Sequence, residues 1–349
     1  MSAHPAEAFR AKHPDRFYLE RSEARALQDY LRSRSVLAEG EIMEEVRQPG
    51  EGNMNCTLRV RTSRRSFIVK QSRPWVEKYP ALAAPADRIL MEAAFYRLLS
   101  EHSKLKLAVP GILDFDAVSR LLVLEDLGEG GDYTDLYRGA SITSADLENA
   151  ADFLTCLHAS FSGESLAASI RNSEMRALNH AHIFDIPLNQ DNGLDLDRMT
   201  TGLDEVARDL RGDPAYAQEV RRLGREAYLG EGICLIHGDF FPGSLVRTPR
   251  GPRVIDPEFC FFGRPEFDAG VFLAHLVLAG RPESDWHHWK ASYHPPEGFD
   301  RGMMWQLAGV EIMRRLIGYA QLPLRIGLNS KRDWLELSRS MVLNPGSFS

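Results

Sequence analysis

The stretch Leu235–Phe259, LIHGDFFPGSLVRTPRGPRVIDPEF, contains the residues that decide the fold and the chemistry of this chain. Within it, SLV and RVI flank a TPRG turn, which is the pattern of a β-hairpin. A hairpin returns the chain to its starting point, so Asp256 is expected to lie close to the loop that holds Asp239. Glu258 follows shortly after. The pattern therefore predicts a group of carboxylates at one end of a short two-stranded ribbon.

Converging carboxylates have three common uses in proteins. They can hold a hard cation such as Mg²⁺, act as a general acid and base in glycoside hydrolysis, or bond backbone amides as structural groups. The stretch around Asp239 does not choose between these uses. The choice depends on the first part of the chain.

The first part of the chain predicts a small β-rich unit. Strands are expected at residues 41–48, 56–62 and 66–70, and the apolar run RLLVLEDLG predicts another strand that is ended by Gly128. Residues 86–100 predict a helix with Asp87 as its N-cap, and residues before Leu37 predict helices. Lys70 ends an apolar strand that follows a glycine-bearing loop, and Glu92 on the next helix could pair with it.

The rest of the chain predicts mainly helices. Leu147, Ala150, Leu154, Leu157 and Phe161 recur at steps of three and four residues, as on a core-facing helix, and Thr143 is placed to cap it. The fold class is therefore α+β. We expect an N-terminal arm and nucleotide-binding β-rich lobe at 1–128 and a helical catalytic and substrate-binding lobe at 129–349.

Phosphoryl transfer requires a lysine beside phosphates, a loop above them and a carboxylate-bound magnesium ion. Lys70, the glycine-bearing loop, Asp239 and Asp256 supply these parts, whereas a glycosidase needs no such lysine strand. The sequence has no Walker A motif, which disfavours a P-loop enzyme.

Composition excludes several other classes of protein. The 42 basic and 49 acidic residues give a net charge of −7, which disfavours nucleic acid or an anionic membrane as the main partner. Four scattered cysteines without a CxxC pair predict reduced thiols. Neither a signal peptide nor a membrane span is expected. These features favour a cytoplasmic protein.

Several motifs, in their order along the chain, resemble those of the aminoglycoside phosphotransferase and choline kinase superfamily. Within it, the methylthioribose kinases are the most similar branch, and the resemblance covers roughly residues 40 to 340. The motifs are GNMN ending at Asn55, VKQ (69–71), EDL (125–127), HGDFFPGS (237–244), IDPEFCFFGRP (255–265), FDAG (267–270) and EIMRRLIG (311–318). The resemblance implies a two-lobed protein-kinase-like fold and an ATP-dependent phosphotransferase with an alcohol group as acceptor.

The resemblance also implies a role for individual residues, with ATP and Mg²⁺ as the nucleotide and the metal ion. Asp239 is expected to deprotonate the attacking hydroxyl and to contact the acceptor together with Arg314 and Arg315. The expected metal ligands are Asp256, Glu258 and Ser244. The expected nucleotide-binding residues are Asn53, Asn55, Lys70, Glu92, Glu125, Asp126 and Leu127.

Three features depart from the methylthioribose kinase pattern. Phe241 replaces a histidine, Pro242 replaces a threonine, and the 271–310 segment is shorter. All three departures flank the expected acceptor site. The resemblance therefore predicts nucleotide binding more firmly than it predicts the identity of the acceptor.

For some of these residues a structural reading competes with a chemical one. Asp268 is expected to bond the backbone of the His237–Asp239 turn, and His237 is expected to be a hydrogen-bonded core residue. Glu311 precedes Arg315 by one helical turn, so a solvated ion pair would account for that arginine without a substrate.

The leading functional hypothesis is a kinase that phosphorylates a sugar hydroxyl, with 5-methylthioribose or a related 5-modified ribose as the acceptor. An aminoglycoside, another antibiotic or an amino alcohol is the alternative acceptor. A nucleotide-binding pseudokinase and a paired-carboxylate hydrolase are the remaining alternatives. The resemblance also implies a homodimer, as is typical of methylthioribose kinases.

Overall fold

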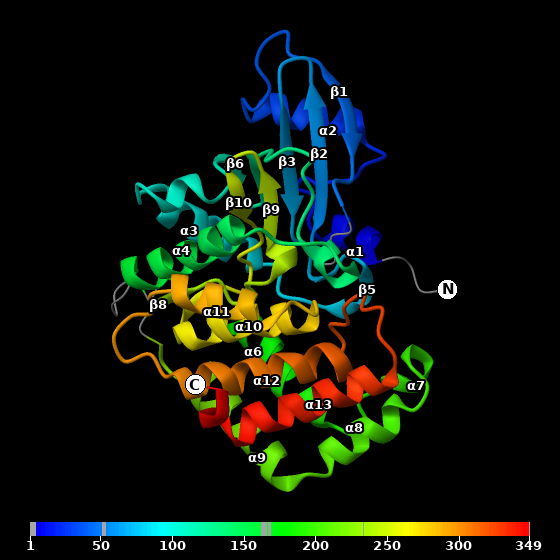
Figure 1. The fold of residues 1–349 in the computed structure, drawn as a ribbon. Helices are drawn as coiled ribbons and strands as arrows, with labels where there is room; N and C mark the ends of the chain where they lie inside the picture. Colours follow the sequence, from blue (N-terminus) through cyan, green and yellow to red (C-terminus); the bar gives the residue numbers. More distant parts are fainter. Residues whose placement is uncertain (1–4, 51–53, 162–165, 167–168, 233, 349) are drawn as a thin grey trace. The chain divides into compact units, whose positions relative to one another are not determined.

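The computed structural model describes residues 5–50, 54–161, 166, 169–232 and 234–348. The chain divides into two compact units, Met1–Gly131 and Asp132–Ser349, whereas the sequence predicted a boundary after Gly128. In Figure 1 the first unit runs from blue to cyan and the second from green to red. Within the described residues, no helix is both long and apolar enough to cross a membrane.

The first unit is built on a five-stranded antiparallel sheet in the order β1-β2-β3-β7-β6. The four strands expected from the sequence are confirmed, whereas β6 and the small β4–β5 pair were not predicted. The strands are β1 (Met43–Arg47), β2 (Cys56–Thr62), β3 (Ser66–Gln71), β4 (Trp75–Val76), β5 (Tyr79–Ala83), β6 (Ile112–Asp116) and β7 (Leu121–Glu125).

One face of this sheet packs against the N-terminal arm, which contains α1 (Pro5–Lys12) and α2 (Ala24–Ser33). The helices expected before Leu37 are therefore confirmed. Alternate residues of a strand point to opposite faces, so Phe67 and Val69 enter this core and Lys70 points away from it. The buried core consists of Leu19, Leu27, Leu31, Val36, Leu37, Leu58, Val60, Phe67, Val69, Leu121 and Val123.

Helix α3 (Arg88–Ser100) packs against β6 and β7. The prediction that Asp87 caps this helix is wrong. Its backbone is already helical, with φ −76° and ψ −3°, and its side chain accepts no hydrogen bond from the first turn. An N-cap needs a non-helical backbone to direct its side chain back at the helix. The Asp87 carboxylate instead pairs with Arg120, at 2.8 Å from Nη2.

The second unit is mostly helical, as the sequence predicted. Thr143 caps α4 (Ser144–Ser160) by accepting a hydrogen bond of 3.1 Å from the Asp146 amide, which confirms the expected cap. Helix α12 (Arg301–Ile317) lies between α10 (Pro265–Leu278) and α13 (Leu328–Leu343) and packs against both (Figure 1). The other α-helices are α6 (Ser173–His180), α7 (Leu196–Met199), α8 (Leu203–Arg211), α9 (Pro214–Leu223) and α11 (Glu283–Ser292).

Two small antiparallel ribbons interrupt the helices of the second unit. Strand β8 (Cys234–Ile236) pairs with β11 (Phe261–Gly263), and β9 (Leu245–Thr248) pairs with β10 (Gly251–Val254). The β9–β10 ribbon is the hairpin predicted around the TPRG turn. The turn that contains Asp239 therefore begins at the end of β8, and Asp256 follows the end of β10.

Candidate active site

The turn after β8 requires glycine at position 238. Gly238 has a φ of +83°, and a Cβ atom there would lie 2.2 Å from the carbonyl oxygen of Phe259. A side chain at this position would be strained and would also collide with the main chain. Glycine thus allows the turn to approach the segment that follows β10, and Asp239 is the next residue.

The backbone of this turn is held by a buried group that we call the backbone clamp: Tyr293, His158 and Asp268. Asp268 accepts hydrogen bonds from the amides of His237 (2.7 Å) and Gly238 (2.9 Å). His158 Nε2 lies 3.2 Å from Asp268 Oδ2, and its Nδ1 lies 2.8 Å from the Tyr293 hydroxyl. The predicted structural role of Asp268 is confirmed.

His237 is a core histidine, as expected from the sequence. Its side chain is fully buried, and Nε2 lies 3.0 Å from the carbonyl oxygen of Ile255. Burial lowers the pKa of this imidazole, so it is neutral near pH 7 and its Nε2–H donates to the carbonyl. The residue ties the Asp239 turn to the end of the hairpin.

Short hydrogen-bonded steps connect Asp239 with the start of the Asp256 segment. The Ser244 hydroxyl donates to the Asp239 carbonyl over 2.8 Å, and the Ile255 amide donates to the Ser244 carbonyl over 2.9 Å. Asp256 then adopts a left-handed conformation with φ +61°. This conformation is uncommon for a residue with a side chain and is often found at functional sites. The expected return of the chain to the Asp239 loop is confirmed.

The donor set of this segment fits a magnesium ion shared with a nucleotide. Asp256 and Glu258 offer carboxylate oxygens, and Mg²⁺ commonly takes one or two carboxylates, with substrate phosphates and water completing the shell. The described residues contain no cluster of three or more His, Cys, Asp or Glu side chains arranged for a metal. Ser244 is buried and its hydroxyl already bonds Asp239. Its role as a metal ligand stays a prediction.

The Asp239 carboxylate faces both arginines of α12. Arg315 Nη2 lies 3.1 Å from Asp239 Oδ1, and Arg314 Nη1 lies 3.6 Å from the same oxygen. The Glu311 carboxylate, on the same helix, also binds both arginines. Its oxygens lie 2.5 Å from Arg315 Nε and 3.0 Å from Arg314 Nη1. The solvated-pair reading of Glu311 and Arg315 is wrong, since Glu311 is 1% exposed and Arg315 is 5% exposed. It failed because sequence spacing cannot show what covers a helix face.

The charges of this group stabilise one another. Burial acts to raise the pKa of Glu311, but the charges of Arg314 and Arg315 outweigh it and hold that pKa far below its usual range. Burial likewise acts to lower the pKa of Arg315, but Glu311 and Asp239 raise it overall. Arg315 and Glu311 are therefore both charged at neutral pH.

Phe241, which departs from the methylthioribose kinase pattern, packs on this group. Its ring centre lies 4.9 Å from the Arg315 guanidinium carbon and 5.0 Å from the centre of the His275 ring. A phenyl ring stacks well on a weakly hydrated guanidinium. The replacement of histidine by phenylalanine thus places an apolar cover over Arg315.

In the first unit, Lys70 pairs with Glu92 as the sequence predicted. Lys70 Nζ lies 2.9 Å from Glu92 Oε1 and 2.8 Å from Oε2, and the two side chains are 5% and 0% exposed. The pair connects β3 with α3 on the sheet face opposite the N-terminal arm. Its contact with a nucleotide stays a prediction.

The predicted adenine-binding segment follows β7 directly. The Asp126 carboxylate accepts hydrogen bonds from Arg59 (2.8 Å) and from the Gly128 amide (3.0 Å). Glu125 accepts one of 3.1 Å from the Gly111 amide. Side-chain contacts therefore fix the chain on either side of Leu127, and main-chain groups remain the expected contacts for an adenine ring.

Two asparagines, Asn53 and Asn55, are predicted to contact the nucleotide. Asn53 lies outside the described residues. Asn55 is buried, and its Oδ1 accepts a hydrogen bond of 2.9 Å from Arg88 Nε. Its side-chain oxygen therefore has a structural partner, and a nucleotide contact stays a prediction.

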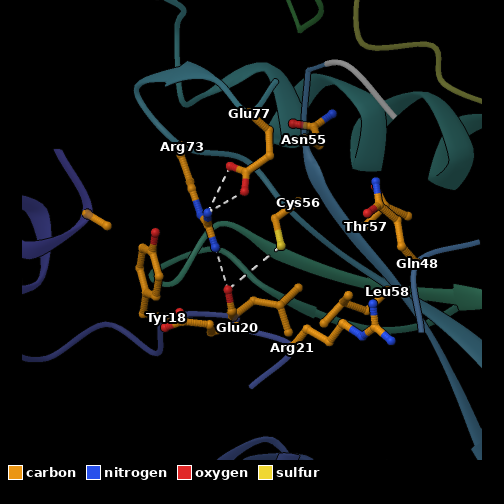
Figure 2. Close-up of a pocket in the computed structure, with 12 residues that line it drawn as sticks. Tyr18, Glu20, Arg21, Gln48, Asn55, Cys56, Thr57, Leu58, Arg73 and Glu77 are labelled. Atoms are coloured by element: carbon orange, nitrogen blue, oxygen red, sulfur yellow. Dashed lines mark hydrogen bonds and ion pairs between the residues drawn. The ribbon is translucent and has the colours of Figure 1, made fainter. Parts of the chain in front are cut away.

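Asn55 also lines a pocket of about 420 Å³ within the first unit (Figure 2). The Arg73 guanidinium in this pocket binds both Glu77 oxygens, at 2.6 and 2.8 Å, and the Leu19 carbonyl. This cation is therefore already paired within the first unit. Its walls are Ala6, Tyr18, Leu19, Glu20, Arg21, Gln48, Asn55, Cys56, Thr57, Leu58, Arg73 and Glu77.

Sequence reasoning missed His275, Tyr137 and His158. His275 gave a usable signal, because it is the one titratable residue in the apolar run VFLAHLVL, and a buried polar side chain needs a partner. Tyr137 and His158 gave no comparable signal, since their importance depends on contacts with distant elements.

A model of the phosphotransferase enzyme family matches residues 45–304 of this chain. The chain belongs to that family. The resemblance stated from the motifs is confirmed at the family level, and so is the predicted phosphotransferase class.

Relatives in the same family include methylthioribose kinases. That of a Geobacillus species is 26% identical over 364 residues and covers 87% of this chain and 87% of the relative. That of Exiguobacterium sibiricum is 26% identical over 250 residues and covers 68% of this chain and 61% of the relative. The second match thus spans less than two thirds of the relative's length.

Among solved structures, spectinomycin phosphotransferase in complex with ADP and spectinomycin is similar with a TM-score of 0.56 and 12% identity. It covers 91% of this chain and 98% of that protein. At this identity the similarity concerns the fold alone. The predicted protein-kinase-like fold, with a β-rich first unit and a helical second unit, is confirmed.

Proposed function

We propose that this protein is a kinase that transfers the γ-phosphate of ATP to a hydroxyl of a small sugar, with 5-methylthioribose or a related 5-modified ribose as the acceptor. The observation that carries the proposal is the contact of the Asp239 carboxylate with the arginine pair of α12. The methylthioribose kinases among the relatives support the acceptor, and the ADP bound to the spectinomycin phosphotransferase supports the nucleotide.

In the proposed reaction Asp239 is the general base. Its carboxylate accepts the proton of the acceptor hydroxyl while the hydroxyl oxygen bonds to the γ-phosphorus and the bond to the ADP oxygen breaks. Contact with Arg315 fixes the orientation of this carboxylate. Arg314 lies close to the same oxygen and supplies positive charge beside the reacting groups.

The nucleotide half of the proposal uses the first unit and the Asp256 segment. Lys70, oriented by Glu92, would bind ATP phosphates. Asn53 and Asn55 would approach the nucleotide from the loop side, and the backbone of Glu125–Leu127 would meet the adenine edge. Asp256, Glu258 and Ser244 would hold Mg²⁺, which when bound neutralises charge on the phosphates.

The charge around Asp239 favours a neutral sugar over a cationic acceptor. The negative charges of Asp239 and Glu311 are balanced by Arg314 and Arg315, so this group has no net charge. Aminoglycosides and choline carry positive charge, and a site for them is expected to be acidic. The balance therefore supports a sugar hydroxyl.

The test is magnesium-dependent release of ADP from ATP with a panel of acceptors: methylthioribose, 5-deoxyribose, ribose, choline and several aminoglycosides. We expect selective turnover of methylthioribose or another 5-modified ribose. Turnover of choline or an aminoglycoside instead would contradict the acceptor assignment. A lack of ADP release with every acceptor would contradict the kinase assignment.

A variant pair tests the assigned base. Asp239→Asn should lower kcat at least 1,000-fold while ATP binding, measured by calorimetry, stays within about threefold of wild type. Asp204→Asn is the matched control, because Asp204 forms an exposed ion pair with Arg208 on α8. Near-normal turnover by Asp239→Asn would show that another group is the base.

A further inference from the structure

We propose that Tyr137, His275 and Glu311, here called the arginine clamp, are positioning residues that fix Arg315 against Asp239. The effect on catalysis rests on the proposed function, since Asp239 must be the base for its orientation to matter. The contacts of the clamp themselves do not depend on that assignment. All three residues belong to the second unit, on η2 (Thr134–Arg138), α10 and α12.

Glu311 is the centre of the arginine clamp. Its Oε1 lies 2.5 Å from Arg315 Nε and its Oε2 lies 3.0 Å from Arg314 Nη1, so each carboxylate oxygen takes one arginine. Charge-assisted bonds of this kind constrain the plane of a guanidinium as well as its position. The Glu311 carboxylate can constrain the guanidinium groups only if its own position is fixed.

His275 holds Glu311 from the neighbouring helix. Its Nε2 lies 3.1 Å from Glu311 Oε1, and its Nδ1 contacts the Tyr137 hydroxyl. Burial and the nearby charge of Arg315 lower the pKa of His275 to about 4, so the ring is neutral near pH 7. The ionised carboxylate can only accept, so Nε2 carries the proton and Nδ1 accepts from Tyr137.

The hydrogen bonds of the clamp therefore converge on Glu311. Tyr137 donates to His275, His275 donates to Glu311, and Arg315 donates to Glu311 and to Asp239. Tyr137, His275 and Glu311 are 5%, 0% and 1% exposed, and Phe241 covers the junction of His275 and Arg315. In such a dry environment each bond is stronger than in water, and an unmade bond is costly.

The two arginines differ in how many partners they have. Arg315 uses Nε for Glu311, Nη2 for Asp239 and Nη1 for the Ala320 carbonyl, at 3.4 Å. Arg314 Nε is buried, yet no acceptor for it exists among the described residues. Arg315 is thus occupied in holding the base, and Arg314 retains a donor for another group at the site. A role of the clamp in fixing Arg315 explains why Arg315 has more hydrogen-bond partners than Arg314.

The test compares clamp variants with a buried tyrosine elsewhere in the same unit. His275→Leu removes both polar contacts of the ring, and His275→Gln keeps an N–H donor for Glu311. Tyr137→Phe removes the hydroxyl that donates to His275 Nδ1. Tyr216→Phe is the matched control, because the hydroxyl of this fully buried tyrosine on α9 bonds Ser338 (2.7 Å) on α13, and neither residue belongs to the clamp.

We expect His275→Leu to lower kcat 10- to 100-fold, with the KM for ATP unchanged, because a small displacement of a reacting group is enough to cause such a loss. His275→Gln should recover most of that loss, Tyr137→Phe should lower kcat several-fold, and Tyr216→Phe should leave it unchanged. Wild-type kcat in His275→Leu, or no recovery in His275→Gln, would overturn the proposal.

A second readout separates this proposal from the proposed function and from simple misfolding. In protein labelled with ¹⁵N-arginine, the Arg315 Nε–H signal, assigned with Arg315→Lys, should be protected from exchange with solvent. His275→Leu should reduce this protection at least tenfold, and Tyr216→Phe should not change it. Unchanged protection would overturn the clamp, whereas changed protection in a protein that phosphorylates no acceptor would overturn only the proposed function.

Discussion

The second unit contains two buried Tyr–His–carboxylate groups that lead to the same turn and end differently. The backbone clamp ends on the amides of His237 and Gly238, whereas the arginine clamp ends on the guanidinium groups of Arg314 and Arg315. In the first, neutral dipoles compensate a buried carboxylate, and in the second, full charges do so. The first therefore fixes where the turn lies, and the second fixes how the Asp239 side chain is oriented.

The largest effect on stability is expected in the arginine clamp, where full charges compensate the buried carboxylate. Glu311→Gln leaves the two buried guanidinium groups with the single negative charge of Asp239, and the free energy of unfolding should fall by about 3–5 kcal/mol. Urea denaturation at pH 7 measures the change. Glu226→Gln is the control, because its ion pair with Arg222 is exposed and should contribute less than about 1 kcal/mol. An equal loss in the two variants would contradict the role of burial.

A smaller effect is expected in the backbone clamp. Asp268→Asn keeps one acceptor oxygen but presents an NH₂ group to a second buried amide, so one amide loses its partner. The free energy of unfolding should fall by about 1–3 kcal/mol, measured in the same urea titrations. A larger loss than in Glu311→Gln would reverse the comparison between dipoles and charges.

The arginine clamp should also make stability depend on pH. The folded-state pKa of His275, about 4, lies below the ordinary value of 6.5, so between these values the unfolded chain binds more protons. Stability should therefore fall as the pH drops through this window, and the His275 contribution should reach about 2 kcal/mol at pH 5 relative to pH 7. The loss between pH 7 and pH 5 should be smaller in His275→Gln by that amount. Identical losses in the two proteins would place the His275 pKa near its ordinary value.

The smallest effect on stability is expected for the tyrosine of each clamp, which is its residue farthest from the Asp239 turn. Tyr137→Phe and Tyr293→Phe each remove one hydroxyl that bonds a buried histidine Nδ1. Each should lower the free energy of unfolding by about 1 kcal/mol, because the lost interaction is a single neutral hydrogen bond. Thermal unfolding of both variants measures this. A difference of more than about 2 kcal/mol between them would mean that one clamp depends on its tyrosine for more than a hydrogen bond.

Features that depend on neighbouring residues followed from the sequence. The TPRG turn and its flanking apolar residues predicted the hairpin that returns Asp256 to the Asp239 loop, and the apolar run SFIVK predicted the strand β3 that carries Lys70. Thr143 was correctly predicted as a cap. Turn chemistry and hydrophobic period act over a few residues, so a sequence contains them directly.

The partners of polar side chains, by contrast, were decided by tertiary structure. Asp87 pairs with Arg120 instead of capping α3, and Asn55 bonds Arg88. The sequence by itself determined the α+β class and the four longer strands that it predicted in the first unit, and it predicted Asp239, Asp256 and Lys70 as candidate site residues. Only the packing of α10 and α12 brought His275 to Glu311 and removed both from water, because burial and long-range pairing arise from the whole fold and leave no local pattern.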